Sequence, residues 1–150
     1  MTIHDLQDQL VRDEDIKLFV YDDANGEPIK PGSHVIGHPT IGIGRALDTH
    51  GISMAEAIYL NNNDIDLVRR GISASLPWTT KLDPVRFSAL ENMAFNLGVN
   101  GLLEFTETLA ALKAGNYEHA ATLMLQSEWA AQVGARAQRL SEQIRTGVWQ

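Results

Sequence analysis

The chain has 150 residues, of which 44% are hydrophobic and 21% are charged, as expected for one globular domain with a buried core. Its formal net charge of −7 and pI of about 5.1 argue against a nucleic-acid partner or an anionic membrane surface. The chain contains no cysteine, which excludes disulfides and thiolate-based zinc sites.

The charge is distributed unevenly along the chain. Residues 1–27 hold eight acidic and two basic side chains, a balance of −6, whereas residues 130–150 hold three basic and one acidic, a balance of +2. A solvated surface without a partner explains this as well as attraction between the two parts does. The start of the chain has no basic segment followed by an apolar run, so we expect no signal peptide. No window approaches the roughly 18 apolar residues of a membrane helix, so we expect no membrane insertion.

The first 50 residues predict one helix and a small sheet. Apolar residues at helical spacing predict a helix over 3–12, started by a cap that Thr2 and Asp5 form. The segment Lys17–Tyr21 is rich in β-forming residues and predicts a strand. Asn-Gly within Asp22–Gly26 predicts a tight turn. The apolar positions of the helix predicted over 3–12 are Ile3, Leu6, Leu10 and Val11.

A looser segment, Glu27–Pro39, contains several glycines and prolines, and the next strand is predicted at Thr40–Gly44. Two glycines in that strand, Gly42 and Gly44, indicate a place where a ligand or another backbone comes close. We expect no helix between Leu47 and Ser53.

Helical patterns fill the remaining chain. Ser53 and Glu56 form a capping box for a helix that runs to about Ala74. Further helices are predicted at about 84–97, 106–114, 117–126 and 134–146. Asp83 and Asn116 are the expected N-caps of the first and third of these, and Gly98 is expected to end the first. In the helix that begins at Ser53, the expected buried positions are Ile58, Ile65, Leu67, Val68 and Ile72. The pattern as a whole predicts an α+β fold with two lobes in a single domain: a small lobe over about 13–52, a connecting helix over 53–74, and a helical lobe of about four helices over 75–150 together with helix 3–12.

Several other functional motifs are not met. Gly42-Ile-Gly44 lacks the third glycine and the context of a dinucleotide-binding loop, and no Gly-x-Ser-x-Gly sequence is present. Asp23–Glu27 resembles the start of a calcium loop, but Pro28 stands where such a loop needs glycine. Three histidines in loops, His34, His38 and His50, are expected at the surface or in turns. We therefore expect neither a cofactor nor a metal.

Two carboxylates remain as candidates for catalysis. Glu14 follows a predicted helix and lies between Asp13 and Asp15, whose charges favour its neutral, proton-donating form. Asp23 follows a predicted strand and can remain ionised as a base. Two such carboxyl groups are the minimum needed to cleave a glycosidic bond. The same pattern also fits two surface residues without a catalytic role.

The sequence resembles the phage-type lysozymes of glycoside hydrolase family 24 over nearly its whole length. The resemblance rests on ordered segments, which are Arg12–Asp23, Thr40-Ile-Gly-Ile-Gly44, Ala89–Gly98, Phe105-Thr106, Ser127-Glu-Trp129 and Arg145-Thr-Gly-Val-Trp149. It implies a lysozyme-like fold, with a small N-terminal β-sheet lobe and a C-terminal helical bundle joined by a long helix. It also implies cleavage of the β-1,4 bond between N-acetylmuramic acid and N-acetylglucosamine in peptidoglycan, with inversion, for lysis of the bacterial cell wall.

The resemblance also implies roles for individual residues. Glu14 would protonate the leaving oxygen, and Asp23, helped by Thr40, would activate a water, with the carboxyl groups roughly 6.5–9.5 Å apart. Substrate-binding positions on the helical lobe would be Phe95, Thr108 and Arg136; core packing explains Phe95 equally well, and Arg136 could instead pair with Glu14.

The chain departs from the family in a loop of sixteen residues between Asp23 and Thr40, where the family has about five. We expect a monomer that is made in the host cytoplasm and acts on the cell wall in the periplasm after release or delivery. Two alternatives remain open: a non-catalytic cell-wall-binding protein on the same fold, and a related chitinase-like glycosidase.

Overall fold

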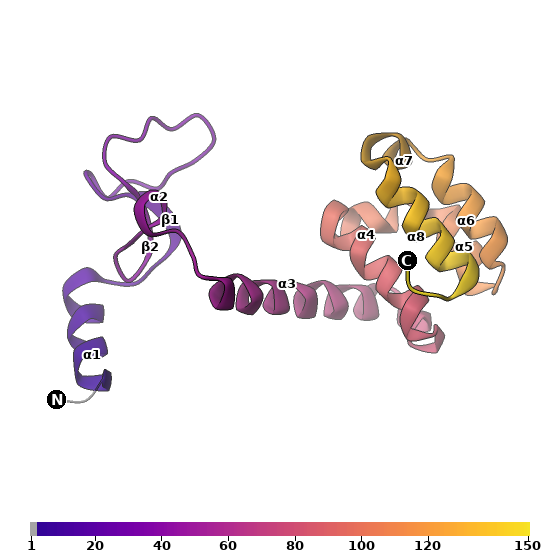
Figure 1. Ribbon diagram of the computed structural model, residues 1–150, viewed down its shortest axis with the longest axis horizontal. Helices are drawn as coiled ribbons and strands as arrows, with labels where there is room; N and C mark the ends of the chain where they lie inside the picture. Colours follow the sequence, from indigo (N-terminus) through magenta and orange to yellow (C-terminus); the bar gives the residue numbers. More distant parts are fainter. Residues whose placement is uncertain (1–2) are drawn as a thin grey trace. The chain divides into compact units, whose positions relative to one another are not determined.

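The computed structural model describes residues 3–150, so Thr2 of the expected helix cap lies outside the described residues (Figure 1). The chain divides into two compact units, Met1–Ile58 and Tyr59–Gln150. The elements of the first unit are α1 (Ile3–Glu14), β1 (Lys17–Asp22), β2 (Pro39–Gly42), β3 (Arg45–Ala46) and α2 (Leu47–His50). Helix α3 (Met54–Ser75) begins in this unit and continues into the second. The second unit continues with η1 (Pro77–Lys81), α4 (Pro84–Leu103), α5 (Thr106–Lys113), α6 (Tyr117–Leu125), α7 (Glu128–Val133) and α8 (Ala135–Thr146).

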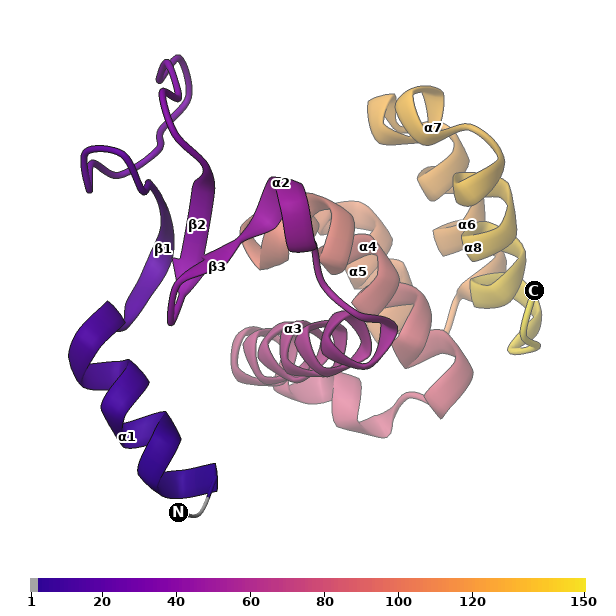
Figure 2. The same cartoon turned by 60° about the vertical axis from the view of Figure 1, so that its left-hand side comes forward.

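The first unit is built on an antiparallel sheet with strand order β1-β2-β3 (Figure 2). Lys17 pairs with Gly42 and Tyr21 pairs with Thr40, with an irregularity between these two pairs. The predicted turn is confirmed, since the backbone N–H of Gly26 donates to the carbonyl of Asp22 at 2.7 Å. A long loop then connects β1 to β2. The end of β1 lies beside the start of β2, since Asp22 pairs with Pro39.

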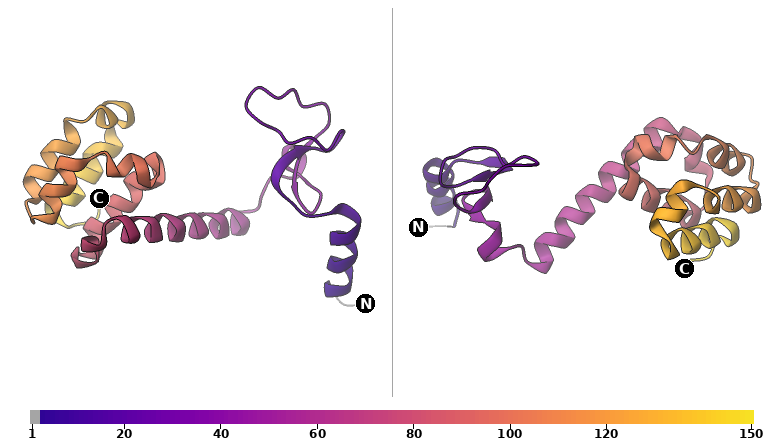
Figure 3. Two further views of the ribbon diagram at one scale, coloured as in Figure 1. Left: turned by 180° about the vertical axis from the view of Figure 1, so that it is seen from behind. Right: turned by 90° about the horizontal axis from the view of Figure 1, so that it is seen from above.

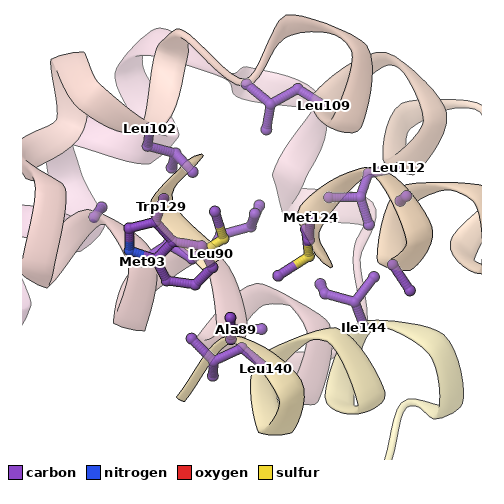
Figure 4. Packing of buried hydrophobic residues seen from close by; sticks show 14 of the residues in the cluster. Ala89, Leu90, Met93, Leu102, Leu109, Leu112, Met124, Trp129, Leu140 and Ile144 are labelled. Carbon is purple, nitrogen blue, oxygen red and sulfur yellow. The ribbon is translucent and has the colours of Figure 1, made fainter. Parts of the chain in front are cut away.

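The second unit is a bundle of helices (Figure 3). Their buried apolar residues form one core. The predicted cap of α4 is confirmed, because the Asp83 carboxylate accepts a hydrogen bond from the N–H of Arg86 at 3.0 Å. Figure 4 shows large side chains from several helices in this core, among them Leu90, Leu112, Met124 and Ile144, which are essentially inaccessible to solvent. Removal of this apolar surface from water stabilises the bundle.

The α+β fold and most predicted elements are confirmed, and the differences are local. The capping box of α3 is present: the N–H of Ser53 donates to the Glu56 carboxylate at 2.8 Å, and the N–H of Glu56 donates to the Ser53 hydroxyl at 3.2 Å. Gly98 ends the first part of α4 as predicted, with φ +76°, but the chain resumes a helical course to Leu103. Helix α7 is an element that the sequence pattern missed, because six residues are too few to show a period.

Two other expectations are wrong. A helix does form between Leu47 and Ser53, since α2 covers Leu47–His50; a single turn without a side-chain cap leaves little trace in a sequence. In α3, Ile58 and Leu67 are exposed rather than buried. The inward stripe of this helix is narrow: Ile72 is buried, and Val68, one turn before it, is partly buried and packs against the core.

Candidate active site

Glu14 is the last residue of α1, and the backbone turns directly after it. Asp15 has φ +63°, a left-handed conformation that aspartate tolerates better than most residues other than glycine. The Asp15 carboxylate accepts a hydrogen bond from the N–H of Ile16 at 2.8 Å, which supports the turn. The exposed Glu14 side chain is therefore placed at the junction of α1 and β1.

The carboxyl group of Glu14 lies against the turn between β2 and β3. A Cβ atom added to Gly44 would lie 3.0 Å from Oε2 of Glu14, whereas one added to Gly42 would meet no atom within 4 Å. Both glycines have positive φ, +70° at Gly42 and +69° at Gly44. The close neighbour of Gly44 is thus the side chain of the candidate acid rather than the ligand or backbone that was expected, and no atom lies close to Gly42.

Asp22 and Asp23 are adjacent but have different environments. Asp22 is 3% exposed, and its carboxylate accepts hydrogen bonds from the backbone N–H groups of Ala24 at 3.0 Å, Ile36 at 2.6 Å and Gly37 at 2.9 Å. These bonds, the one from Ile36 first, hold the pKa of Asp22 below its ordinary value. Asp22 thus anchors the long loop, and Asp23 is the exposed carboxylate of the two.

Asp23 and Thr40 both contact the backbone of His38. Oδ1 of Asp23 accepts a hydrogen bond from the N–H of His38 at 2.6 Å, and the N–H of Asp23 donates to the carbonyl of His38 at 3.1 Å. The hydroxyl of Thr40 donates to the same carbonyl at 3.1 Å. Thr40 is 3% exposed, so it supports this arrangement from beneath the surface. The first unit thus brings Asp23 and Thr40 together around one residue.

Two ion pairs brace the surroundings of these residues. The imidazole Nδ1 of His38 lies 2.8 Å from Oδ2 of Asp48 in α2. The Arg45 guanidinium lies 2.9 Å from the Glu56 carboxylate and also donates to the carbonyl of Gly51 at 3.1 Å. The first pair connects the residue just before β2 to α2, and the second connects β3 to α3.

The predicted substrate-binding residues lie in the second unit. Phe95 is 45% exposed, and together with Arg136 it lines a pocket of about 390 Å³. The Arg136 guanidinium is held by Asn92, donating through Nε to its side-chain oxygen at 2.8 Å and through Nη2 to its carbonyl at 3.1 Å. Thr108 is absent from the lining of this pocket and is only 4% exposed within α5, so little of its surface is available to a ligand.

The same pocket contains residues that the sequence did not single out. Glu91 is 9% exposed, and its carboxylate accepts a hydrogen bond from Nε of Arg69 at 2.7 Å. The exposed ring of Trp149 also lines the pocket. One signal could have identified Glu91: it lies at helical spacing from Phe87 and Ala94, on the apolar side of the predicted helix, where an unpaired carboxylate would be costly to bury.

Among the side chains that the structure describes, which begin at residue 6, no group of three or more histidines, aspartates or glutamates is arranged to hold a metal ion. No helix of this part of the chain is long and apolar enough to cross a membrane.

Comparison with known proteins identifies similar proteins. The family model described as "Phage lysozyme" matches residues 22–145. The chain is similar to the pre-baseplate central spike protein Gp5 of Enterobacteria phage T4, at 32% identity over 95% of this chain; it spans only 28% of the length of that protein. It is also similar to the probable T4-type lysozymes 1 and 2 of Dictyostelium discoideum, each at 27% identity over 97% of this chain and 96% of the relative.

Proposed function

Because the chain belongs to the phage lysozyme family, a family of glycoside hydrolases, we propose that it hydrolyses the β-1,4 bond between N-acetylmuramic acid and N-acetylglucosamine in peptidoglycan. The observation that carries the proposal is that the carboxylates of the first unit differ in solvent exposure and in hydrogen bonding. Asp22 is buried and fully engaged by the loop, whereas Asp23 and Glu14 are exposed on separate elements.

In the proposed reaction Glu14 donates its proton to the glycosidic oxygen as the bond to the anomeric carbon breaks. Asp23 accepts a proton from a water molecule whose oxygen attacks that carbon from the opposite face of the sugar. One oxygen of Asp23 is held by the N–H of His38, and Thr40 stabilises the same backbone segment. The configuration at the anomeric carbon inverts, and solvent exchange returns both carboxyl groups to their starting protonation states.

Inversion requires space for the attacking water, so we expect the carboxyl groups of Glu14 and Asp23 to stand roughly 6.5–9.5 Å apart when substrate is bound. Phe95 and Arg136 are proposed to bind the glycan or its peptide, because they share one pocket. A role for Thr108 in substrate binding, and an ion pair of Arg136 with Glu14, stay predictions.

The proposed partner is the glycan strand of peptidoglycan, acted on by a monomer after the protein leaves the host cytoplasm. Peptidoglycan is anionic, and a net charge of −7 disfavours long-range attraction to it. We therefore expect added salt, which screens this repulsion, to leave the association rate unchanged or to raise it.

The test is hydrolysis of purified, outer-membrane-free Gram-negative cell walls by the wild type, Glu14→Gln and Asp23→Asn. The matched control is Asp8→Asn, which removes another exposed carboxylate of α1, six residues before Glu14. We expect the two catalytic variants to lose about 10²- to 10⁴-fold in kcat, the range typical of general acid or base removal, and the control to retain wild-type activity.

Product analysis separates the alternatives. Proton NMR at early times should show the inverted anomer first, and appearance of the retained anomer would refute the water-activating role of Asp23. Binding of the wild type to cell walls without bond cleavage would support a non-catalytic wall-binding protein. Cleavage of chitin oligosaccharides but not of peptidoglycan would support a chitinase-like glycosidase.

A further inference from the structure

The backbone of His38 is the meeting point of two residues assigned to the reaction. Its N–H donates to Oδ1 of Asp23 at 2.6 Å, and its carbonyl accepts from the N–H of Asp23 and the hydroxyl of Thr40, each at 3.1 Å. A displacement of the His38 backbone would therefore move the Asp23 carboxylate and remove the hydrogen-bond acceptor of Thr40 together.

The side chain of His38 ties this backbone to a different element. Nδ1 of the imidazole lies 2.8 Å from Oδ2 of Asp48, which is in α2, and both side chains are about half exposed. No backbone ladder of β2 includes His38, since the strand begins at Pro39. The ion pair therefore adds a link between this backbone and α2, which the contacts with Asp23 and Thr40 do not supply.

The preceding loop increases the need for such a contact. Sixteen residues separate Asp23 from Thr40, and Asp22 anchors the loop at Ile36 and Gly37, the two residues before His38. A long loop has many conformations of similar energy unless specific contacts select one. Asp22 and Asp48 hold the returning end of the loop from two sides, at consecutive residues.

We propose that His38 is a positioning residue, whose ion pair with Asp48 orients Asp23 and Thr40 for hydrolysis. This inference rests on the proposed function of Asp23. His38 does not itself contact the bond that breaks, since its ring is directed to Asp48, and it acts through the backbone hydrogen bonds.

The strength of the contact between His38 and Asp48 depends on the charge of the imidazole. Three carboxylates face it: Asp48 from α2, and Asp23 and Asp22 from the end of β1. They raise the pKa of His38 above its ordinary value of 6.5, the hydrogen bond to Asp48 contributing most. The ion pair is thus complete below that raised pKa and weakens to a neutral hydrogen bond as pH rises through it. The kcat of the wild type should therefore decrease in part as pH rises through the pKa of His38.

The experiment measures kcat and KM on soluble glycan strands between pH 5 and 9 for the wild type, His38→Ala, His38→Asn and Asp48→Asn. We expect His38→Ala to lower kcat about tenfold at pH 6, because the Asp23 carboxylate would be displaced by part of an ångström. KM should change little. His38→Asn should restore most of this loss, because an amide can donate to Asp48 from the place of Nδ1, but its profile should lack the alkaline step. In Asp48→Asn the step should move to lower pH.

A matched control is His50→Ala, since His50 is an exposed histidine of α2 whose ring contacts the hydroxyl of Thr49. It should leave kcat and the pH profile unchanged. Circular dichroism verifies that each variant is folded. Hydrogen exchange of the amides of residues 23 and 38, followed by NMR, tests the contact without reference to activity, and both amides should exchange faster in His38→Ala.

The outcomes separate this proposal from the proposed function. If the wild type is active and His38→Ala keeps its kcat and pH profile, the positioning role is refuted while the proposed function stands. If the wild type does not hydrolyse glycan strands although amide exchange responds as expected, the proposed function fails and the role in catalysis fails with it. A decrease of kcat with loss of the alkaline step in His38→Ala, and rescue by His38→Asn, supports the proposal.

Discussion

Gly44 offers a substitution that separates an effect on Glu14 from an effect on the backbone. Alanine at this position must adopt φ near +69°, which costs about 1 kcal/mol relative to glycine. Its Cβ would also lie 3.0 Å from Oε2 of Glu14, closer than an ordinary contact. That oxygen ends a flexible side chain, so it can move by a few tenths of an ångström at small cost in stability. The acid would then be displaced from its position for proton transfer.

Gly42 is the matched control, because it has nearly the same φ, +70°, and a Cβ there would meet no atom within 4 Å. Urea unfolding should therefore show Gly42→Ala and Gly44→Ala destabilised by similar amounts, about 1 kcal/mol each. Hydrolysis of soluble glycan strands should differ: Gly44→Ala should lose about tenfold in kcat, and Gly42→Ala should retain it. Equal kcat values in the two variants would refute the assignment of Glu14 as an acid that the turn holds in place.

Three further predictions concern stability. Asp15→Gly should change the free energy of unfolding by less than about 1 kcal/mol in either direction, because relief of the strain at φ +63° is offset by loss of the hydrogen bond from the N–H of Ile16 and by the greater freedom of glycine in the unfolded chain. A loss of several kcal/mol in urea unfolding would contradict this balance. Glu91→Gln should destabilise the second unit by about 1–2 kcal/mol, since it removes the charge that pairs with the half-exposed Arg69. A double-mutant cycle with Arg69→Ala should show coupling between the two residues, and additive effects on the free energy of unfolding would argue against the pair. Asp22 has a pKa lowered from 3.8 in the folded protein, so its contribution to stability is present above that value and is lost as pH falls through the lowered pKa. Asp22→Asn should thus be less stable at pH 7 and less sensitive to acid than the wild type, and an unchanged acid unfolding profile would contradict the anchoring role.

The local pattern of the sequence predicted most elements of the fold. Helical spacing of apolar residues and the caps Ser53, Asp83 and Asn116 identified the long helices, and each cap makes the expected hydrogen bond to the backbone. These features are readable because they depend on residues within three or four positions of one another. Short elements, α2 and α7, were missed because one or two turns do not establish a period.

The candidate site was predictable only in part. Strand alternation indicates that Asp22 and Asp23 point to opposite faces, but it does not say which face the loop covers. The fold decides this, because the N–H groups of Ile36 and Gly37 close over Asp22 and leave Asp23 exposed. Thr108 shows the same limit, since its place in α5 is readable from the sequence and its burial is not.

The sequence by itself determined the family, the α+β class and the residues available for acid–base chemistry. Only the tertiary structure decided how these residues are held: Glu14 against Gly44, Asp23 against the backbone of His38, and His38 against Asp48. The physical reason is the distance along the chain. Periodicity and capping act over a few residues, whereas these contacts join residues ten to thirty positions apart, and they form only where chain closure and packing bring separate elements together.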